Sequence, residues 1–501
     1  MSTQCLASSG STAAQTSNLD VKRLTANYKP SIWSCDFLQS LQIDDRNHEE
    51  VYGDNRWKLM EEDLKNMIDA ESLETTLELI DDIQQLDVFK FFMDCDGSFK
   101  DCLCKDVKGM LSLYEASFLG IEGETLLEKA LAFTSMHLKN LSRLHVTQDK
   151  GVLEQVSHAL EMPLHHRMQR LDARWYIEAY SKKAYASQVL LEFAKLDYNV
   201  VQQTYQRDFK DISRWWKDKG LAKKLSFSRD RLMEWFFWSV GIVSEPQFSD
   251  VRKGITKVGA LITTIDDVYD VYGTLDELEL FTSVVERWDV NAVEILSDYQ
   301  LELCFLALYN TVNEMTYETL KEQGVNVLPY LTKAYTPTFD EYLANAWISV
   351  SGVVILVHTY FLLNQNISNE ALKCLENHHD LLCWQSVIFR LLNDLATLKA
   401  ELERGETATS ISCIKRGGVV SDEESAHKYI SNLIESSWKK MNKDGLIFGA
   451  NSASSPFTKE FVAAATNLAR IAQCIYQYGD GIGAPDKRVK NRILAVIVQP
   501  V

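Results

Sequence analysis

The chain has 501 residues, 46% of them hydrophobic and 10% aromatic, which is enough apolar material for two domains with sizeable cores. Its 52 basic and 70 acidic side chains give a net charge of −18, which opposes binding to nucleic acid and to anionic membranes. The ten cysteines form no CxxC pair, and no apolar run approaches the roughly twenty residues of a membrane span. The composition therefore predicts no nucleic-acid partner, no membrane span and neither a zinc site nor a disulfide scaffold.

Residues 1–21 differ in composition from the rest of the chain. The first nineteen residues carry no charged side chain and are rich in Ser, Thr and Ala. This composition resembles an organelle transit peptide that lacks the usual arginines, and a plain disordered tail is the alternative.

Helical periodicity dominates the remaining sequence. Apolar residues recur at spacings of three and four, as in LETTLELIDDI, QVLLEFAKLDYNVV and FVAAATNLARIAQCI, while only 8 prolines and 22 glycines interrupt the chain. We therefore predict an all-α protein, with an N-terminal helical domain over residues 22–190 and a C-terminal helical domain over residues 191–501. The chemically suggestive residues all lie in the second domain. A solenoid is the alternative, but no fixed-period repeat supports it.

The first of three polar clusters in that domain is SFSRDRLMEWFFW, which contains Arg229 and Arg231. Two guanidinium groups so close together suit a diphosphate, and Ser228 is placed to cap a helix whose N-terminal amides add to an anion site. Trp238 lies two turns further along nearly the same face, where an aromatic ring would stabilise a cation. The alternative for Trp238 is an ordinary core position.

The second cluster, KVGALITTIDDVYD, contains two carboxylates on one helical face. Asp266 and Asp270 lie one turn apart, and Gly259 and Thr263 continue their stripe deeper into the predicted helix. Paired carboxylates at this spacing suit octahedral Mg²⁺, which removes their repulsion and completes its shell with water and phosphate oxygens. A solvated acidic helix end is the alternative.

The third cluster, FRLLNDLATLKAELERGE, carries Asn393, Thr397 and Glu401 at successive intervals of four, with Arg390 one turn earlier on the same face. These oxygen donors are candidates for a second magnesium site, and an ordinary polar helix face is the alternative. Taken together, the three clusters predict a site that uses metal and charge to remove a diphosphate from an apolar substrate and shelters the resulting carbocation.

Longer motifs point to a family. The segments NYKPSIW, LSLYEASFLGIEGE, QRLDARWYIEAY, SRWWKDKGL, YGTLDELELFTSVVERWD, RGETATSISC and YQYGDG, with the clusters above, cover nearly the whole chain. In these motifs the chain resembles the plant class I terpene synthases of the angiosperm monoterpene and isoprene synthase group. The resemblance implies a C-terminal class I terpenoid synthase α-barrel that holds three Mg²⁺ ions, with Mn²⁺ as an alternative ion. It also implies a lyase that acts on a prenyl diphosphate and works as a monomer.

The resemblance assigns a role to each matching position. The implied metal ligands are Asp266, Asp267, Asp270, Asn393, Thr397 and Glu401. The implied substrate-binding residues are Arg229, Arg231, Asp266, Asp270, Arg390 and Asn393. The implied catalytic residues are Arg229, Trp238, Tyr476 and Asp480. Helix geometry separates Asp267 from the other two aspartates, because it points about 100° away from Asp266. We therefore expect Asp267 to act indirectly and its replacement by Ala to cost less activity than that of Asp266.

Three departures from the family pattern matter. The tandem-arginine motif that precedes Trp33 reads Arg23, Leu24, so its second arginine is absent. That motif is associated with isomerisation before ring closure, and its loss favours acyclic products. The chain also lacks roughly fifty family residues near 86–87, in the N-terminal domain. Near 335–336, in the catalytic domain, it lacks roughly twenty more, about five turns of helix.

The predicted substrate follows from position 259. Isoprene synthases carry a bulky Phe where this chain has Gly259, which favours a ten-carbon substrate, whereas Phe389 is shared with isoprene synthases. We expect a monoterpene synthase that converts geranyl diphosphate into a volatile, acyclic product of the ocimene or myrcene type. The alternatives are an isoprene synthase that uses dimethylallyl diphosphate and a truncated, non-catalytic isoform. A chain-elongating prenyl synthase would need a second aspartate-rich motif where this chain has NDLATLKAE. Family habit places such an enzyme in the plastid (chloroplast) stroma, with the cytoplasm as the alternative.

Overall fold

The computed structural model describes residues 92–144, 149–184, 186–333, 351–404, 422–450 and 455–501, together with 23, 28, 30–33, 37, 411 and 414. In these ranges the named elements are helices, apart from one isolated bridge between Met93 and Phe99. The predicted all-α fold is therefore confirmed. The proposed leader over residues 1–21 and the two junctions, at 86–87 and 335–336, lie outside the described residues. No described helix is both long and apolar enough to cross a bilayer.

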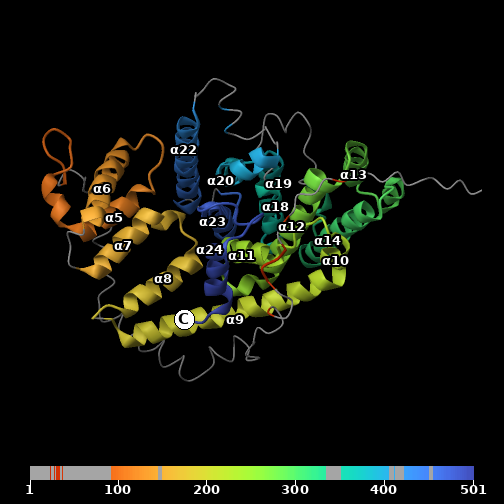
Figure 1. The fold of residues 1–501 in the computed structure, drawn as a ribbon, viewed down its shortest axis with the longest axis horizontal. Coiled ribbons are helices and arrows are strands. Elements are labelled where there is room, and N and C mark those ends of the chain that lie inside the picture. Colours follow the sequence, from red (N-terminus) through yellow and green to blue (C-terminus); the bar gives the residue numbers. More distant parts are fainter. Residues whose placement is uncertain are drawn as a thin grey trace, which may run out of the picture.

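The N-terminal half forms a small helical bundle with its own core. It comprises α5 (Val107–Ser117), α6 (Thr125–Leu144) and α7 (Lys150–Glu161), which pack on one another at one end of the molecule (Figure 1). Asp106 and Asp149 cap α5 and α7 by accepting hydrogen bonds from backbone amides of their first turns. The core residues include Met110, Tyr114, Leu138 and Val156.

A long helix connects this bundle to the rest. After α8 (Gln169–Ser181), α9 (Gln188–Lys219) runs beneath both halves of the molecule (Figure 1). It ends at Gly220, whose φ of 70° requires the conformational freedom of glycine. The C-terminal segment returns onto α9, where the Gln202 amide donates to the Val496 carbonyl at 3.1 Å.

The C-terminal half is a ring of helices. α11 (Leu232–Ile242) packs on α12 (Ser249–Asp267), which packs on α18 (Gly352–Leu362), then α20 (Asp380–Arg404), then α23 (Lys459–Tyr476), and α23 returns to α11. α11 is buried along its whole length, which explains its uniformly apolar sequence. The ring is the predicted α-barrel, and its interior is where the three clusters meet.

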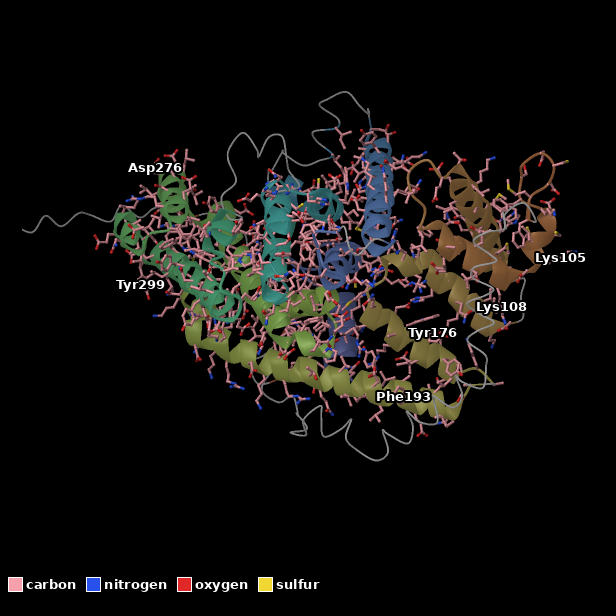
Figure 2. The ribbon with its side chains drawn as sticks, turned by 180° about the vertical axis from the view of Figure 1, so that it is seen from behind. Lys105, Lys108, Tyr176, Phe193, Asp276 and Tyr299 are labelled. Atoms are coloured by element: carbon pink, nitrogen blue, oxygen red, sulfur yellow. The ribbon has the colours of Figure 1, made fainter. Side chains whose placement is uncertain are left out.

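Further helices surround the ring. They are α10 (Leu221–Lys224), α13 (Leu275–Arg287), α14 (Tyr299–Gln323), α15 (Leu328–Lys333), α19 (Asn369–Glu376), α22 (Glu423–Ala450) and α24 (Lys487–Ile493). Seen from behind, Asp276 on α13 and Tyr299 at the start of α14 lie at the end of the molecule away from Lys105 and Lys108 (Figure 2).

Two histidines join the halves. The ring of His166 stacks on Trp438 of α22 at 4.0 Å, and His165 Nε2 lies 2.7 Å from the side-chain oxygen of Asn442. Burial lowers the pKa of His165 from its ordinary value of 6.5 to about 4 and lowers that of His166 well below its ordinary value. Both rings are therefore neutral in the native protein at neutral pH.

This interface predicts a loss of stability in acid. Between pH 6.5 and about 4 the unfolded chain binds protons at these histidines that the native chain does not, so the free energy of unfolding falls as the pH falls. Each histidine contributes a slope of up to about 1.4 kcal/mol per pH unit. Urea unfolding at pH 7, 6 and 5 measures it. His166→Phe keeps a ring against Trp438 but cannot take a proton, so its slope should be shallower. An identical slope would contradict this account.

Candidate active site

The first half of the site is an arginine between two carboxylates. Arg229 Nη2 lies 2.5 Å from Asp266 Oδ2, and Arg229 Nε lies 2.7 Å from Asp267 Oδ1. The backbone N–H of Arg229 also donates to Asp267 Oδ2 at 2.6 Å. The Asp267 side chain is fully buried, whereas that of Asp266 is 53% exposed. The two adjacent aspartates thus face opposite environments, Asp267 toward the protein and Asp266 toward the open side.

Burial and charge act against each other in this cluster. Burial raises the pKa of Asp267 to about 6, although Arg229 opposes the rise. Burial lowers the pKa of Arg229, but the charges of Asp266 and Asp267 outweigh it and raise the pKa overall. The Arg229 guanidinium therefore stays charged, and the buried Asp267 carboxylate holds it in place.

The helix changes geometry where the motif continues. α12 ends at Asp267 and the chain goes on as a π-helical turn, Val268–Tyr272, which carries the exposed Asp270. A π turn holds more residues than an α turn. Asp270 thus lies on an irregular turn directly after the α-helical Asp266. Such turns frequently occur at functional sites.

N-terminal residues reach this part of the site. The guanidinium of Arg23 donates to the Tyr272 carbonyl at 2.8 Å, to Glu277 at 2.6 and 3.0 Å, and to Asp298 at 3.0 Å. The ring of Tyr28 lies 4.7 Å from the Arg229 guanidinium carbon. Residues that the sequence assigned to the N-terminal domain thus contact Arg229 and the segment that follows Asp270 in the C-terminal domain.

The second half of the site lies on α20. Arg390 Nε pairs with Asp394 Oδ1 at 2.8 Å, and Asp394 is fully buried. Asn393 is half-buried, and the Thr397 hydroxyl donates to the Asn393 carbonyl at 2.9 Å. Glu401 belongs to α20, but its side chain lies outside the described part of the structure. α20 therefore repeats the pattern of α12, in which a partly exposed arginine pairs with a fully buried aspartate beside a polar face.

Aromatic rings lie between the two halves. Trp238 of α11 is fully buried, with its ring 4.8 Å from Phe389 of α20 and 6.2 Å from Tyr476 of α23. The Tyr476 side chain hydrogen-bonds Asn393, and its pKa is raised by burial and then by Asp480. Asp266 and Arg229 also act on that pKa, so the two halves of the site converge at Tyr476.

Arg231 and Asp480 order a loop. Arg231 is 2% exposed and donates to the carbonyls of Ile482 at 2.7 Å and Gly483 at 3.1 Å. Asp480 accepts from the Gly483 amide at 2.7 Å. Burial lowers the pKa of Arg231. In this structure these two residues hold the 480–483 loop beside the site, whereas Arg229 and Arg390 line the partly open side.

The structure contradicts the expected space at Gly259. A Cβ at this position would overlap ring carbons of Trp235, which lies directly against the glycine. Trp235 is 4% exposed, and its Nε1 donates to the Thr263 hydroxyl at 2.7 Å. The prediction that Gly259 opens room below the diphosphate is wrong, because a tryptophan from the neighbouring helix fills that room.

The oxygen donors fit magnesium. Asp266 and Asp270 are exposed carboxylates, and Asn393 and Thr397 supply neutral oxygens, the ligand types that Mg²⁺ prefers. Among the described side chains no three of His, Cys, Asp or Glu lie close enough to share a metal ion. A metal ion between α12 and α20 would therefore draw on mixed donors from both helices and displace Arg229 from Asp266.

Two contributors escaped the sequence reasoning. Asp394 follows Asn393 directly and lies one turn from Arg390, so its pairing could have been read from the i,i+4 spacing. Trp235 offered no signal in a stretch of aromatic residues.

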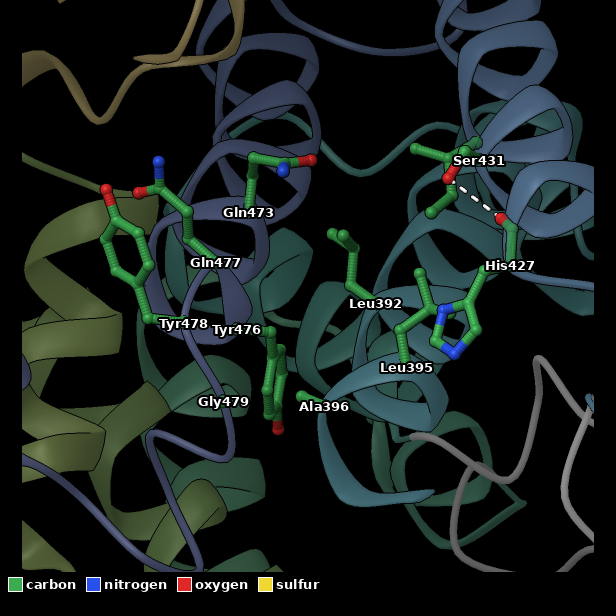
Figure 3. Close-up of a pocket in the computed structure, with 11 residues that line it drawn as sticks. Leu392, Leu395, Ala396, His427, Ser431, Gln473, Tyr476, Gln477, Tyr478 and Gly479 are labelled. Atoms are coloured by element: carbon green, nitrogen blue, oxygen red, sulfur yellow. Dashed lines mark hydrogen bonds between the residues drawn. The ribbon is translucent and has the colours of Figure 1, made fainter. Parts of the chain in front are cut away.

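A separate cavity of about 610 Å³ lies between α20, α22 and α23 (Figure 3). Leu392 and Leu395 line it from the side of α20 turned away from Thr397. Tyr476 contributes its ring to this cavity, while its side chain bonds Asn393. The cavity therefore lies behind the polar face of α20 and is not the site of the charged clusters.

Known proteins share these features. Residues 217–440 match the terpene synthase family, metal binding domain, and residues 86–160 match the terpene synthase, N-terminal domain. A chloroplastic tricyclene synthase of Medicago truncatula is 48% identical over 551 aligned positions, covering 96% of this chain and 92% of that protein. The chain belongs to the terpene synthase family, in the group of plant monoterpene and isoprene synthases. It is a carbon–oxygen lyase that acts on diphosphates and contains a metal-binding domain.

Solved structures of plant terpene synthases also match the fold of this chain. The isoprene synthase of grey poplar (Populus x canescens), in complex with three Mg²⁺ ions and dimethylallyl-S-thiolodiphosphate, matches with a TM-score of 0.76 and 51% identity, over 82% of this chain and 80% of that one. A limonene synthase with 2-fluorolinalyl diphosphate matches with a TM-score of 0.84 and 34% identity, over 96% and 100%. The alignment with the Medicago protein is longer than this 501-residue chain, so that relative contains segments that this chain lacks.

The ion pairs predict unequal effects of the two adjacent aspartates on stability. Asp267→Asn leaves the Arg229 guanidinium with a buried, uncharged neighbour and should lower the free energy of unfolding by about 3–5 kcal/mol. Asp266→Asn, at an exposed carboxylate, should change it little. Urea unfolding without metal measures both. Equal destabilisation would show that burial does not distinguish the two residues.

The contacts of Arg23 predict local order. Arg23→Ala should increase amide hydrogen exchange in residues 268–277, because it removes the hydrogen bonds to the Tyr272 carbonyl and to Glu277. Arg214→Ala is the control, since Arg214 is 67% exposed and pairs only with its own helix among the contacts described. Unchanged exchange in residues 268–277 would mean that Arg23 does not hold the π-helical turn.

Proposed function

We propose that this protein is a monoterpene synthase, which releases diphosphate from geranyl diphosphate in a magnesium-dependent reaction and forms a volatile, acyclic ten-carbon olefin of the ocimene or myrcene type. The observation that carries the proposal is that two charged, partly exposed clusters lie on either side of buried aromatic rings. The first cluster contains Arg229 of the loop before α11 and Asp266 of α12, and the second contains Arg390 and Asn393 of α20. Trp238 and Tyr476 lie between them.

In this proposal the charged residues activate the leaving group. Arg229 and Arg390, while still paired with Asp267 and Asp394, direct their remaining N–H donors to the diphosphate and neutralise the charge that develops as its C–O bond breaks. Asp266, Asp270, Asn393, Thr397 and Glu401 would hold magnesium ions, which would supply further positive charge to the leaving diphosphate. Asp267 keeps Arg229 in place and acts indirectly. Arg231 and Asp480 order the neighbouring loop.

The aromatic residues stabilise the cation that remains after diphosphate has left. Loss of diphosphate leaves an allylic cation, which the rings of Trp238 and Tyr476 stabilise through their electron-rich faces. The raised pKa keeps the Tyr476 hydroxyl neutral, so it adds a dipole and no charge. Transfer of one proton from the cation to the departing diphosphate gives the olefin and closes the reaction.

Two features support an acyclic product. Leu24 stands where the family pattern has its second arginine, and the remaining Arg23 is engaged by Glu277 and Asp298. The pairing of Arg23 stabilises the segment that follows the first aspartate motif and engages both terminal nitrogens of its guanidinium. Isomerisation before ring closure therefore lacks its usual partner.

A specific observation favours a second candidate, isoprene formation from dimethylallyl diphosphate. Trp235 fills the space next to Gly259, and Phe389 packs on Trp238, so the aromatic floor is higher than the sequence indicated. A shallower floor suits a shorter substrate. Substrate preference thus separates the two candidates.

A third outcome, a non-catalytic isoform, follows if the missing segments remove part of the catalytic domain. We place the monomeric enzyme in the plastid, in keeping with the chloroplastic Medicago relative.

Product analysis tests the proposal. Purified protein with Mg²⁺ and geranyl diphosphate should release an acyclic ten-carbon olefin detectable by gas chromatography, and chelation of the metal should abolish it. Asp266→Asn should lower kcat by about 10²–10³. Asp250→Asn, on the same helix at a 92% exposed position, should not. Isoprene from dimethylallyl diphosphate, with no product from geranyl diphosphate, would overturn the ten-carbon assignment.

A further inference from the structure

Position 259 and Trp235 form one packing unit. Gly259 has no side chain, and a Cβ there would overlap the six-membered ring of Trp235. The indole is fixed in its plane by the hydrogen bond from Nε1 to Thr263, and it lies 5.5 Å from the ring of Trp238. The glycine is therefore needed so that the indole can lie flat against α12.

This unit lies directly below the charged groups. Gly259 precedes Asp266 by seven residues on α12, which corresponds to a depth of about 10 Å. Trp235 comes one turn after Arg231 on α11, and Trp238 continues the aromatic surface toward Phe389. A substrate whose diphosphate is held at Asp266 would meet the indole with the far end of its hydrocarbon chain.

We propose that Trp235 is a specificity-determining residue that closes the floor of the substrate cavity in place of a side chain at position 259, and that it keeps the ten-carbon chain from folding into a ring. The inference rests on the proposed function and assigns the acyclic outcome to this site. Ring closure requires the terminal double bond to fold back onto C1 after diphosphate has left. A rigid indole at the floor removes the room for that fold.

The absence of a second arginine at Leu24 offers a competing explanation, and the two act at different steps. An isomerisation defect blocks only the conversion of the E double bond of geranyl diphosphate to the Z form. The indole of Trp235 at the cavity floor would instead prevent the hydrocarbon chain from folding, whichever double-bond geometry the substrate has. Neryl diphosphate already has the Z double bond and bypasses isomerisation. Its products therefore report on Trp235 alone.

The test compares the cyclic fraction of the products from neryl diphosphate in the wild type, Trp235→Ala, Trp235→Leu and Trp235→Phe. The wild type and Trp235→Phe should give mainly acyclic olefin, and Trp235→Ala and Trp235→Leu should raise the cyclic fraction about tenfold. Trp215→Ala, a half-buried tryptophan on α9, is the control and should change nothing. A wild type that already cyclises neryl diphosphate, or an unchanged fraction in Trp235→Ala and Trp235→Leu, overturns the proposal.

Failure of the proposed function is distinguishable from failure of this inference. If the wild type converts only dimethylallyl diphosphate, the function fails, and the role of Trp235 then predicts that Trp235→Ala gains turnover of geranyl diphosphate. If Trp235→Ala gains no turnover of geranyl diphosphate, the proposed role of Trp235 is overturned. If no substrate is converted, thermal unfolding decides. Gly259→Phe should lower the Tm strongly in the wild type and little in Trp235→Ala, and equal lowering in both overturns the packing unit.

Discussion

The buried ion pair between Arg229 and Asp267 is the constraint on which the site depends. A fully buried carboxylate is costly unless a charged partner lies against it, and here Arg229 supplies both its guanidinium and its backbone amide. Through this pair the loop before α11 is fastened to the end of α12. Asp266 is then left on the open side, where its carboxylate is 53% exposed and pairs with the Arg229 guanidinium. A second pair, Arg390 with Asp394, repeats the arrangement on α20.

The interior of the ring is shaped by the same close packing. α11 has no exposed face, so its tryptophans must find room inside the ring, and Gly259 gives one of them that room. Although glycine is small, the space beside Gly259 is filled in the structure by the indole of Trp235. The volume at the floor is set by a pair of residues on two helices, and the identity of either one alone does not predict it.

Segments far apart along the chain contact one another and connect the two halves of the protein. Arg23 pairs with Glu277 just after the first aspartate motif, the ring of Tyr28 lies over the Arg229 guanidinium, and Trp33 donates from its indole to the buried Glu234 on α11 at 3.0 Å. At the other end, His165 and His166 join the N-terminal bundle to α22. The domains that the sequence separates at residue 190 therefore share contacts both at the site and away from it, and substitutions in the first half can act on the chemistry of the second.

The sequence by itself determined the helical class, the family and the polar faces of α12 and α20, because the 3.6-residue period fixes which side chains of one helix point the same way. It separated Asp266 from Asp267 for that reason, and the spacing of Arg390 and Asp394 was equally readable. Only the tertiary structure decided which residues of different helices meet. The partner of Asp267, the engagement of Arg231 by the 480–483 loop and the indole over Gly259 all depend on how helices pack across the ring, and periodicity within one helix carries no information about its neighbour.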